Sequence, residues 1–268
     1  MLLRRAGLGV LVVLLCSGHS ALAEDVHWSL STSINYSSGD YGTGQDTALL
    51  YIPFTLGVAP TDRLRLSLTI PYIEQDSQTV VVTSGGVAVR KGKERELATS
   101  PRSVTRSESG VGDVLLKGQY VLLEEKAIIP EVSPYLKVKF PTADEDRGLG
   151  TGEFDETLGI DVSKSLFERL VAYLTLAYTF VGSPPGESFA DSFGWSVGAA
   201  YLLTNTLTVF SFLDGATAIS PGQADPLEIR FGAEYRLTKA WKFTGSVGKG
   251  LSDGSPDFDL SAGVAFRF

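Results

Sequence analysis

Apolar and polar residues alternate one by one along most of this 268-residue chain, and no other feature limits its possible folds so strongly. Alternation with period two places successive side chains on opposite faces of a β-strand. Twelve segments follow the pattern, and an even number allows one antiparallel sheet to close on itself. The segments are 26–36, 48–59, 64–73, 112–123, 132–140, 154–163, 170–181, 194–203, 207–213, 227–237, 241–249 and 258–268.

Segment 227–237 indicates which face would meet lipid in such a barrel. Its apolar positions alternate with Glu228, Arg230, Glu234 and Arg236. An arginine turned toward the middle of a bilayer costs about 2–4 kcal/mol, so the charged face should point into the lumen. A slip by one residue would reverse every side chain and is strongly disfavoured.

The ninth segment, 207–213, does not reveal its orientation. Leu207, Val209 and Leu213 fall on one face, whereas Phe210 and Phe212 fall on the other. Both faces are apolar enough to meet lipid, so the sequence leaves the two orientations open.

The connections between segments fall into two length classes that alternate along the chain. Transmembrane barrels place short turns at the periplasmic end and longer loops outside the cell. A soluble β-sandwich has no reason to sort its loops in this way. The pattern therefore predicts an all-β, antiparallel, up-and-down transmembrane β-barrel of about twelve strands over residues 24–268. The short connections are 60–63, 124–130, 165–169, 204–206 and 238–240, and the long ones are 37–46, 74–111, 141–153, 182–193, 214–226 and 252–257.

Residues 1–23 have the pattern of a cleaved secretory signal peptide. Arg4 and Arg5 precede an apolar run, and small residues at Ala21 and Ala23 suit a cleavage site. A lipoprotein signal is the alternative, but it requires a small residue before Cys16, where the chain has Leu15. We expect export to the outer membrane of a Gram-negative bacterium.

Composition excludes several other classes of protein. Cys16 is the only cysteine, so the exported chain would have neither disulfides nor thiol chemistry. The chain has 31 acidic against 23 basic residues, which argues against a nucleic-acid partner. No segment after residue 23 has the roughly 18 consecutive apolar residues of a membrane helix.

Catalytic chemistry is hard to assemble from this chain. His27 is the only histidine after residue 23, and it lies at the start of the first segment, without a placed partner for acid–base work. The glycine-rich stretch 148–152 lacks the third glycine of a nucleotide-binding fingerprint, because Glu153 occupies that position. We therefore predict no catalytic residue and no cofactor.

Two charged clusters could bind ligands, although solvated loops are the simpler explanation of both. The acids at 144–146 and 155–156 could collect Ca²⁺ or Mg²⁺, but they lack a recognised spacing, and we predict no metal site. The basic run 90–95, with Arg102 and Arg106, could contact lipopolysaccharide phosphates from an outer loop.

Two sets of residues are candidates for function in a barrel. The chain ends on the alternating strand 258–268, whose terminal aromatic residues resemble the signal read by the barrel-assembly machinery, so Phe266 and Phe268 are candidate assembly residues. Charged residues on the inward faces would line the pore. This predicted set is Asp113, Lys117, Lys137, Lys139, Asp161, Glu228, Arg230, Glu234, Arg236, Asp259 and Arg267.

Three short stretches resemble a known family. Gly110-Val-Gly-Asp-Val-Leu115, Lys139-Phe-Pro-Thr-Ala-Asp144 and Gly148-Leu-Gly-Thr-Gly152 resemble the outer-membrane transporters grouped under the meta-pathway of phenol degradation. Ala143 stands where a glycine is usual. The resemblance implies a channel for a small molecule and carries no catalytic residues with it.

We therefore predict a passive outer-membrane channel for a small solute, aromatic or hydrophobic by family analogy. Eight strands leave an interior filled by side chains and 16–18 leave an aqueous channel, so a twelve-stranded barrel lies between the two. The alternative is a closed structural or adhesive barrel that acts through its outer loops. An enzyme would need a nucleophile and a base that the sequence does not offer.

Overall fold

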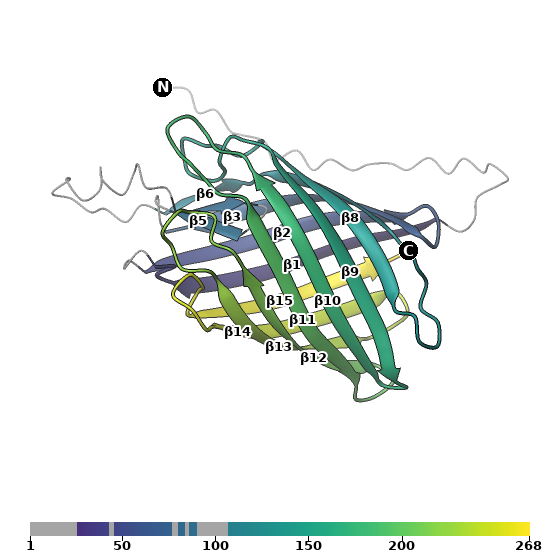
Figure 1. The fold of residues 1–268 in the computed structure, drawn as a ribbon. Coiled ribbons are helices and arrows are strands. Elements are labelled where there is room, and N and C mark those ends of the chain that lie inside the picture. The colour runs from purple at the N-terminus through teal and green to yellow at the C-terminus, as the bar shows by residue number, and fades with distance from the viewer. Residues whose placement is uncertain (1–25, 43–45, 77–79, 84–85, 90–106) are drawn as a thin grey trace, which may run out of the picture.

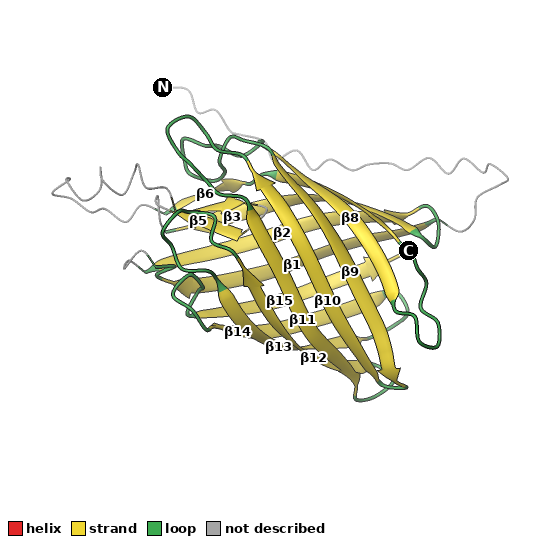
Figure 2. Cartoon of the chain, in the orientation of Figure 1, coloured by secondary structure: helices red, strands yellow, loops and turns green. Residues whose placement is uncertain are grey.

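The computed structural model describes residues 26–42, 46–76, 80–83, 86–89 and 107–268, and these form strands joined by turns and loops (Figure 2). The expected signal peptide and the basic run 90–95 lie outside the described residues. The strands are β1 (His27–Gly39), β2 (Thr47–Ala59), β3 (Leu64–Gln75), β4 (Val80–Thr83), β5 (Gly86–Val89), β6 (Glu108–Val111), β7 (Val114–Tyr120), β8 (Glu131–Phe140), β9 (Asp155–Phe167), β10 (Leu170–Val181), β11 (Ser192–Leu202), β12 (Leu207–Ala216), β13 (Leu227–Arg236), β14 (Trp241–Gly250) and β15 (Phe258–Arg267).

The main sheet closes into an antiparallel barrel (Figure 1). Each strand pairs with its neighbours in the chain, and β15 pairs with β1 to complete the ring. Strands β6 and β7 both pair with β3 and together occupy one strand position of the ring. The barrel therefore has twelve strand positions, as the alternation predicts. At the seam, Trp28 and Phe268 exchange two backbone hydrogen bonds of 3.1 and 3.0 Å.

The outer surface of the barrel is apolar. Leu30, Phe231 and Leu260 face outward, and each leaves 52–53% of its surface exposed. An apolar belt of this extent would be strongly disfavoured in water and suits the hydrocarbon of a membrane. Among the described residues there is no helix long and apolar enough to span a bilayer.

The connections gather at two ends of the barrel, which we call the short-turn end and the long-loop end. The short turns are 60–63, 121–130, 168–169, 203–206 and 237–240. The long loops are 40–46, 76–107, 141–154, 182–191, 217–226 and 251–257. The expected alternation of short and long connections is present with one exception, because the turn 121–130 is longer than the loops 40–46 and 251–257.

Strand β12 settles the orientation that the sequence left open. Phe212 pairs with Arg230 and Phe210 with Gly232, both on the inward face of β13. Leu213 pairs with Ile229 on the outward face. The leucines and Val209 therefore face lipid, and the two phenylalanines face the lumen.

Two features differ from the sequence expectation. The segment 74–111, expected as an uninterrupted loop, contains a separate hairpin of β4 and β5. The fourth predicted strand is divided into β6 and β7. Val111 of β6 pairs with Tyr72, and Leu115 of β7 pairs with Thr69, so three residues on the β6–β7 side lie opposite two residues of β3. This is a β-bulge, and Gly112 and Asp113 occupy it.

Candidate functional site: the lumen and its inward-folded loop

The bulge turns Asp113 toward the lumen. Before it, Glu108 and Gly110 face inward, and after it Leu115 and Lys117 do, so the inward face changes from even to odd residues. A Cβ on Gly112 would overlap the side chain of Ile73, so glycine is required where the chain crosses from one register to the other. The carboxylate of Asp113 is buried as a result.

Asp113 belongs to a buried ion cluster centred on Lys139. The ammonium of Lys139 is 2.9 Å from Asp113 Oδ2 and 3.2 Å from Asp155 Oδ2. It also donates a 2.8 Å hydrogen bond to Thr151 Oγ1. Only 2% of the Lys139 surface is exposed, so a passing solute cannot reach its charge. Burial of these charges is tolerated because each has partners of opposite sign.

Backbone amides complete the cluster. Asp113 Oδ1 accepts hydrogen bonds from the amides of Thr142 (3.0 Å) and Ala143 (2.9 Å). Asp155 Oδ1 accepts one from the amide of Gly182 at 3.1 Å. The second negative charge, which Lys139 alone would not neutralise, is thus stabilised by hydrogen-bond donors.

Residues 148–151 of the loop 141–154 are buried against the inner face of the barrel, whereas residues 144–147 are exposed. Leu149 is buried against Leu49 and Ile73 on the inner face of β2 and β3. The backbone carbonyl of Gly148 accepts a 2.8 Å hydrogen bond from the side-chain amide of Gln75. Gly148 and Gly152 both have φ of +73°, a conformation that favours glycine. Glycines here permit a fixed, inward-folded loop.

The three stretches that resemble the phenol-degradation family therefore meet at one place. The bulge supplies Asp113, the end of β8 supplies Lys139, and the loop supplies Thr151. Asp155 of β9 was expected only as a possible metal ligand in a solvated loop; it is instead a fully buried partner of Lys139. In the structure these motifs hold the loop against the inner face of the barrel.

A second polar group occupies the inner wall midway along β7–β10. Asp161 accepts hydrogen bonds from Gln119 (2.7 Å) and Thr175 (2.7 Å), and Lys117 lies 3.6 Å from it. Lys117 also lies over the ring of Tyr135, 3.9 Å from its centre. Lys137 pairs with Lys117 across the β7–β8 ladder and shares this inward face.

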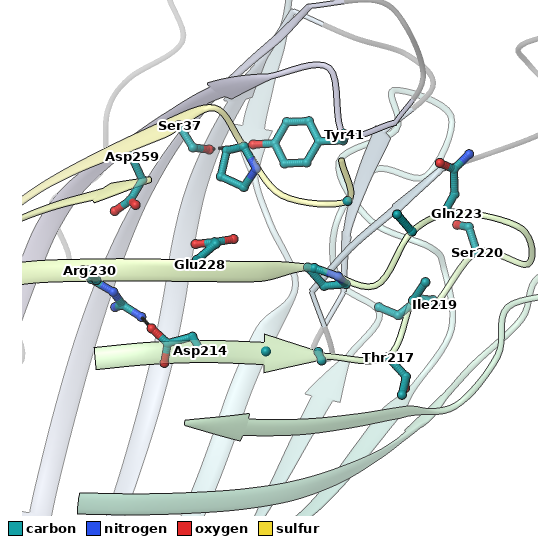
Figure 3. Close-up of a pocket in the computed structure, with 17 residues that line it drawn as sticks. Ser37, Tyr41, Asp214, Thr217, Ile219, Ser220, Gln223, Glu228, Arg230 and Asp259 are labelled. Carbon is teal, nitrogen blue, oxygen red and sulfur yellow. Dashed lines mark hydrogen bonds and ion pairs between the residues drawn. The ribbon is translucent and has the colours of Figure 1, made fainter. Parts of the chain in front are cut away.

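The long-loop end contains a cavity of about 360 Å³ (Figure 3). Arg230 and Asp214 form an ion pair of 2.5 Å at its wall, and Glu228 and Asp259 point into the same space. These four groups are three carboxyl groups and one guanidinium. Tyr41 lines the cavity, and its hydroxyl forms a 2.9 Å hydrogen bond with Ser37 Oγ.

Tyr41 itself lies in the loop beyond β1 and is held in an unusual state. Its φ is +49°, in the left-handed region that residues with a side chain rarely adopt. Burial raises the pKa of its hydroxyl to about 12, with smaller contributions from Glu228 and Asp259. The hydroxyl of Tyr41 is therefore neutral at neutral pH.

A second cavity, of about 530 Å³, lies at the short-turn end. Its charged lining is basic, with Arg65, Lys117 and Arg267 beside His27. His27 thus lies at the short-turn end, as its sequence position implies. Elsewhere at this end Glu234 forms a 3.0 Å ion pair with Lys242, and Arg236 lies at the end of β13.

Sequence analysis missed an aromatic strip on the inner wall. Tyr173 and Phe212 have ring centres 5.8 Å apart, and Phe210 and Phe212 are separated by the same distance. Gly198 and Gly232 lie beside Phe212 and Phe210 on the neighbouring strands, and a Cβ at either glycine would overlap the ring. The signal was present as glycines opposite phenylalanines, but it becomes visible only when the strand register is known.

A closed twelve-stranded barrel with an apolar outside and a charged, polar inside defines an outer-membrane β-barrel of the channel and porin type. Comparison with known sequences narrows this class. The sequence profile of the family described as "Putative MetA-pathway of phenol degradation" matches residues 66–268, and the chain belongs to this family.

Solved structures agree with the fold. An outer membrane channel from Pseudomonas putida F1 is 17% identical, with a TM-score of 0.66, over 95% of this chain and 100% of that one. The NanC porin is 11% identical, with a TM-score of 0.57, over 88% and 98% of the two chains. The KdgM porin is 10% identical, with a TM-score of 0.52, over 90% and 99%. Similarity at these identities concerns the fold.

Proposed function

We propose that the chain is a passive channel of the Gram-negative outer membrane for a small solute. Residues 1–23 would direct its export, and the long-loop end would face the outside of the cell. The solute would cross the barrel beside the locked loop 141–154, between the two cavities. The proposal requires no cofactor and no catalytic step.

The observation that carries this proposal is the small size of the inward side chains between the cavities. Strands β1 and β15 line the cavity at the long-loop end through Ser37 and Asp259. They line the cavity at the short-turn end through Ser29 and Arg267. Between these points their inward residues are small or short: Ser31, Ser33, Asn35, Ser261, Gly263 and Ala265. Adjacent β14 adds Thr244, Ser246 and Gly248.

Loop 141–154 packs on the inner face of β2 and β3 through Leu149, and we propose that the solute passes beside it, along the small residues of β1, β15 and β14. Of the predicted pore-lining charges, we propose that Glu228, Arg230, Asp259 and Arg267 lie along the path. We propose a structural role for Asp113 and Lys139, because their burial removes them from contact with a solute.

An aromatic solute is favoured by the strip of Tyr173, Phe210 and Phe212. A planar ring can stack against these side chains while its polar group contacts the wet wall across the lumen. Family membership in a group named for phenol degradation points to the same class of solute, although this argument is one of association.

Single-channel recording of the purified protein in planar bilayers tests the proposal. Discrete conductance steps that decrease on addition of phenol would support an aromatic-accepting channel. A folded, heat-modifiable barrel that conducts nothing would instead support the alternative, a closed structural or adhesive barrel.

A further inference from the structure

One short turn differs from all the others in the described chain. The turn 121–130 is longer than the other four, and its tip is apolar: Ile128 leaves 90% of its surface exposed. The tips of the other turns carry polar residues such as Asp62, Asn205 and Lys239. In Figure 1 this turn is the teal loop that leads into β8, beside the C-terminus.

The turn is fixed against the end of β9. Glu125 Oε1 accepts hydrogen bonds from Lys164 Nζ and from the backbone amide of Ser165, both at 2.9 Å. Lys164 Nζ also donates to the carbonyl of Lys126 at 2.6 Å. These bonds lower the pKa of Glu125, the one with Lys164 having the largest effect, so the carboxylate is ionised and paired at neutral pH. The apolar tip is thus presented in a defined position.

The turn 121–130 lies against the outer surface of the barrel wall. Lys164 pairs with Ala172 on the face of β10 that also carries the exposed Leu174 and Leu176. A lysine on this face would be unfavourable next to hydrocarbon, but the turn covers it and neutralises its charge. The turn therefore lies on the outside of the barrel, at the level where the membrane surface is expected.

The exposed apolar residues of the turn continue an existing surface. Phe167, 73% exposed, lies at the adjoining end of β9. Tyr120 leads into the turn and belongs, with Tyr201, Tyr235 and Trp241, to the exposed aromatic residues at the short-turn end. Such aromatic residues mark the membrane–water interface of a barrel. We name the exposed residues Leu122, Leu123, Ile128, Ile129, Leu166 and Phe167 the apolar foot.

We propose that the apolar foot inserts into the phospholipid leaflet at the short-turn end and anchors the barrel there. Ile128 and Phe167 would contact acyl chains just below the headgroups, and the exposed ammonium of Lys126 would reach a lipid phosphate. Continuity with the lipid-facing wall favours lipid over a soluble protein as the occupant. The foot is independent of whether the lumen conducts.

Depth-dependent fluorescence quenching tests this anchor. The full chain with Cys16→Ser has no native thiol, so Ile128→Cys can carry a single environment-sensitive fluorophore. Asn205→Cys in a polar short turn is the matched control, and Leu136→Cys on the lipid-facing wall is the positive control. Each variant is placed in vesicles of phosphatidylethanolamine and phosphatidylglycerol that contain lipids with a doxyl quencher either close to the headgroup, at the depth expected for position 128, or deep in the acyl chain, at the depth of position 136.

The label at position 128 should be quenched several-fold more strongly than the label at 205, and its emission should shift to shorter wavelength. Glu125→Ala, which removes the bonds to Lys164 and Ser165, should reduce that quenching. Heat-modifiable migration checks that each variant is folded. If the label at 128 is as exposed to water as the label at 205 while the label at 136 is quenched, the foot does not bind lipid and the proposal is wrong.

Discussion

The ammonium of Lys139 lies 2.9 Å from the carboxylate of Asp113, and this contact joins the end of β8 to the β-bulge between β6 and β7. The residue pair is buried, and the loop contributes the hydroxyl of Thr151 to the same ammonium. This buried charge is therefore one of the contacts that hold the loop, together with the packing of Leu149 and the hydrogen bond from Gln75 to Gly148.

Replacing Lys139 by methionine should destabilise the barrel and release the loop. Two buried carboxylates would lose their counter-ion, and breaking a buried pair in this way costs about 3–5 kcal/mol. Urea unfolding in detergent should show this loss of stability. In single-channel recordings the conductance should increase and the current noise should rise. Lys242→Met removes an exposed ion pair with Glu234 and should cost about 1 kcal/mol or less. If the two substitutions reduce the free energy of unfolding equally, Lys139 does not have the proposed role in holding the loop.

Removing the rings of Phe210 and Phe212 should weaken block of the channel by phenol. Stacking between aromatic groups contributes about 0.5–1.5 kcal/mol, which corresponds to roughly a two- to tenfold increase in the phenol concentration needed for half block. Leu213→Ala changes a residue on the lipid side of the same strand and serves as the control. If the phenol concentration needed for half block is unchanged in the double variant, the aromatic strip does not lie on the solute path.

The alternation of side chains predicts the faces of most strands, because charge excludes one orientation in strands such as β13. It does not decide β12, since phenylalanine suits lipid and lumen alike. The inward orientation depends on Gly198 and Gly232, which leave room for the rings on neighbouring strands. That information lies in the strand register and is absent from the local sequence.

Loop 141–154 shows a second limit of sequence reasoning. Its glycines and acids are typical of a solvated loop, and burial of Asp155 requires the ammonium of Lys139 on β8 and the backbone amide of Gly182. These partners are separated along the chain and are brought together by the pairing of β8, β9 and β10. The same limit explains why Lys139 was grouped with the solute-accessible lysines.

Deletion of Phe268 should lower the amount of barrel in the outer membrane and leave export across the inner membrane unaffected. The residue closes the seam with Trp28, and its ring stacks on Phe266 with centres 5.6 Å apart. Phe258→Ala, at the other end of the same strand, should reduce yield much less. Quantification of outer-membrane fractions compares the two. Normal yield after deletion would show that Phe268 is dispensable for assembly.

The long-loop end should face the outside of the cell. A protease site inserted at Gly92, within the connection between β5 and β6, should be cut in intact cells. A site inserted at Lys239 in a short turn should be cut only after the outer membrane is breached. Immunoblots of treated cells report the fragments, and the reverse pattern would overturn this orientation.

The most direct test of the proposed path is single-channel conductance after filling the small-residue face at the β1–β15 seam. Gly263→Trp places a bulky side chain inward beside Ser33, whereas Ala262→Trp places the same side chain outward toward lipid. The account predicts a severalfold lower conductance for Gly263→Trp and an unchanged conductance for Ala262→Trp, with both barrels folded. Equal conductance of the two variants and the unmodified protein would contradict a solute path along the seam.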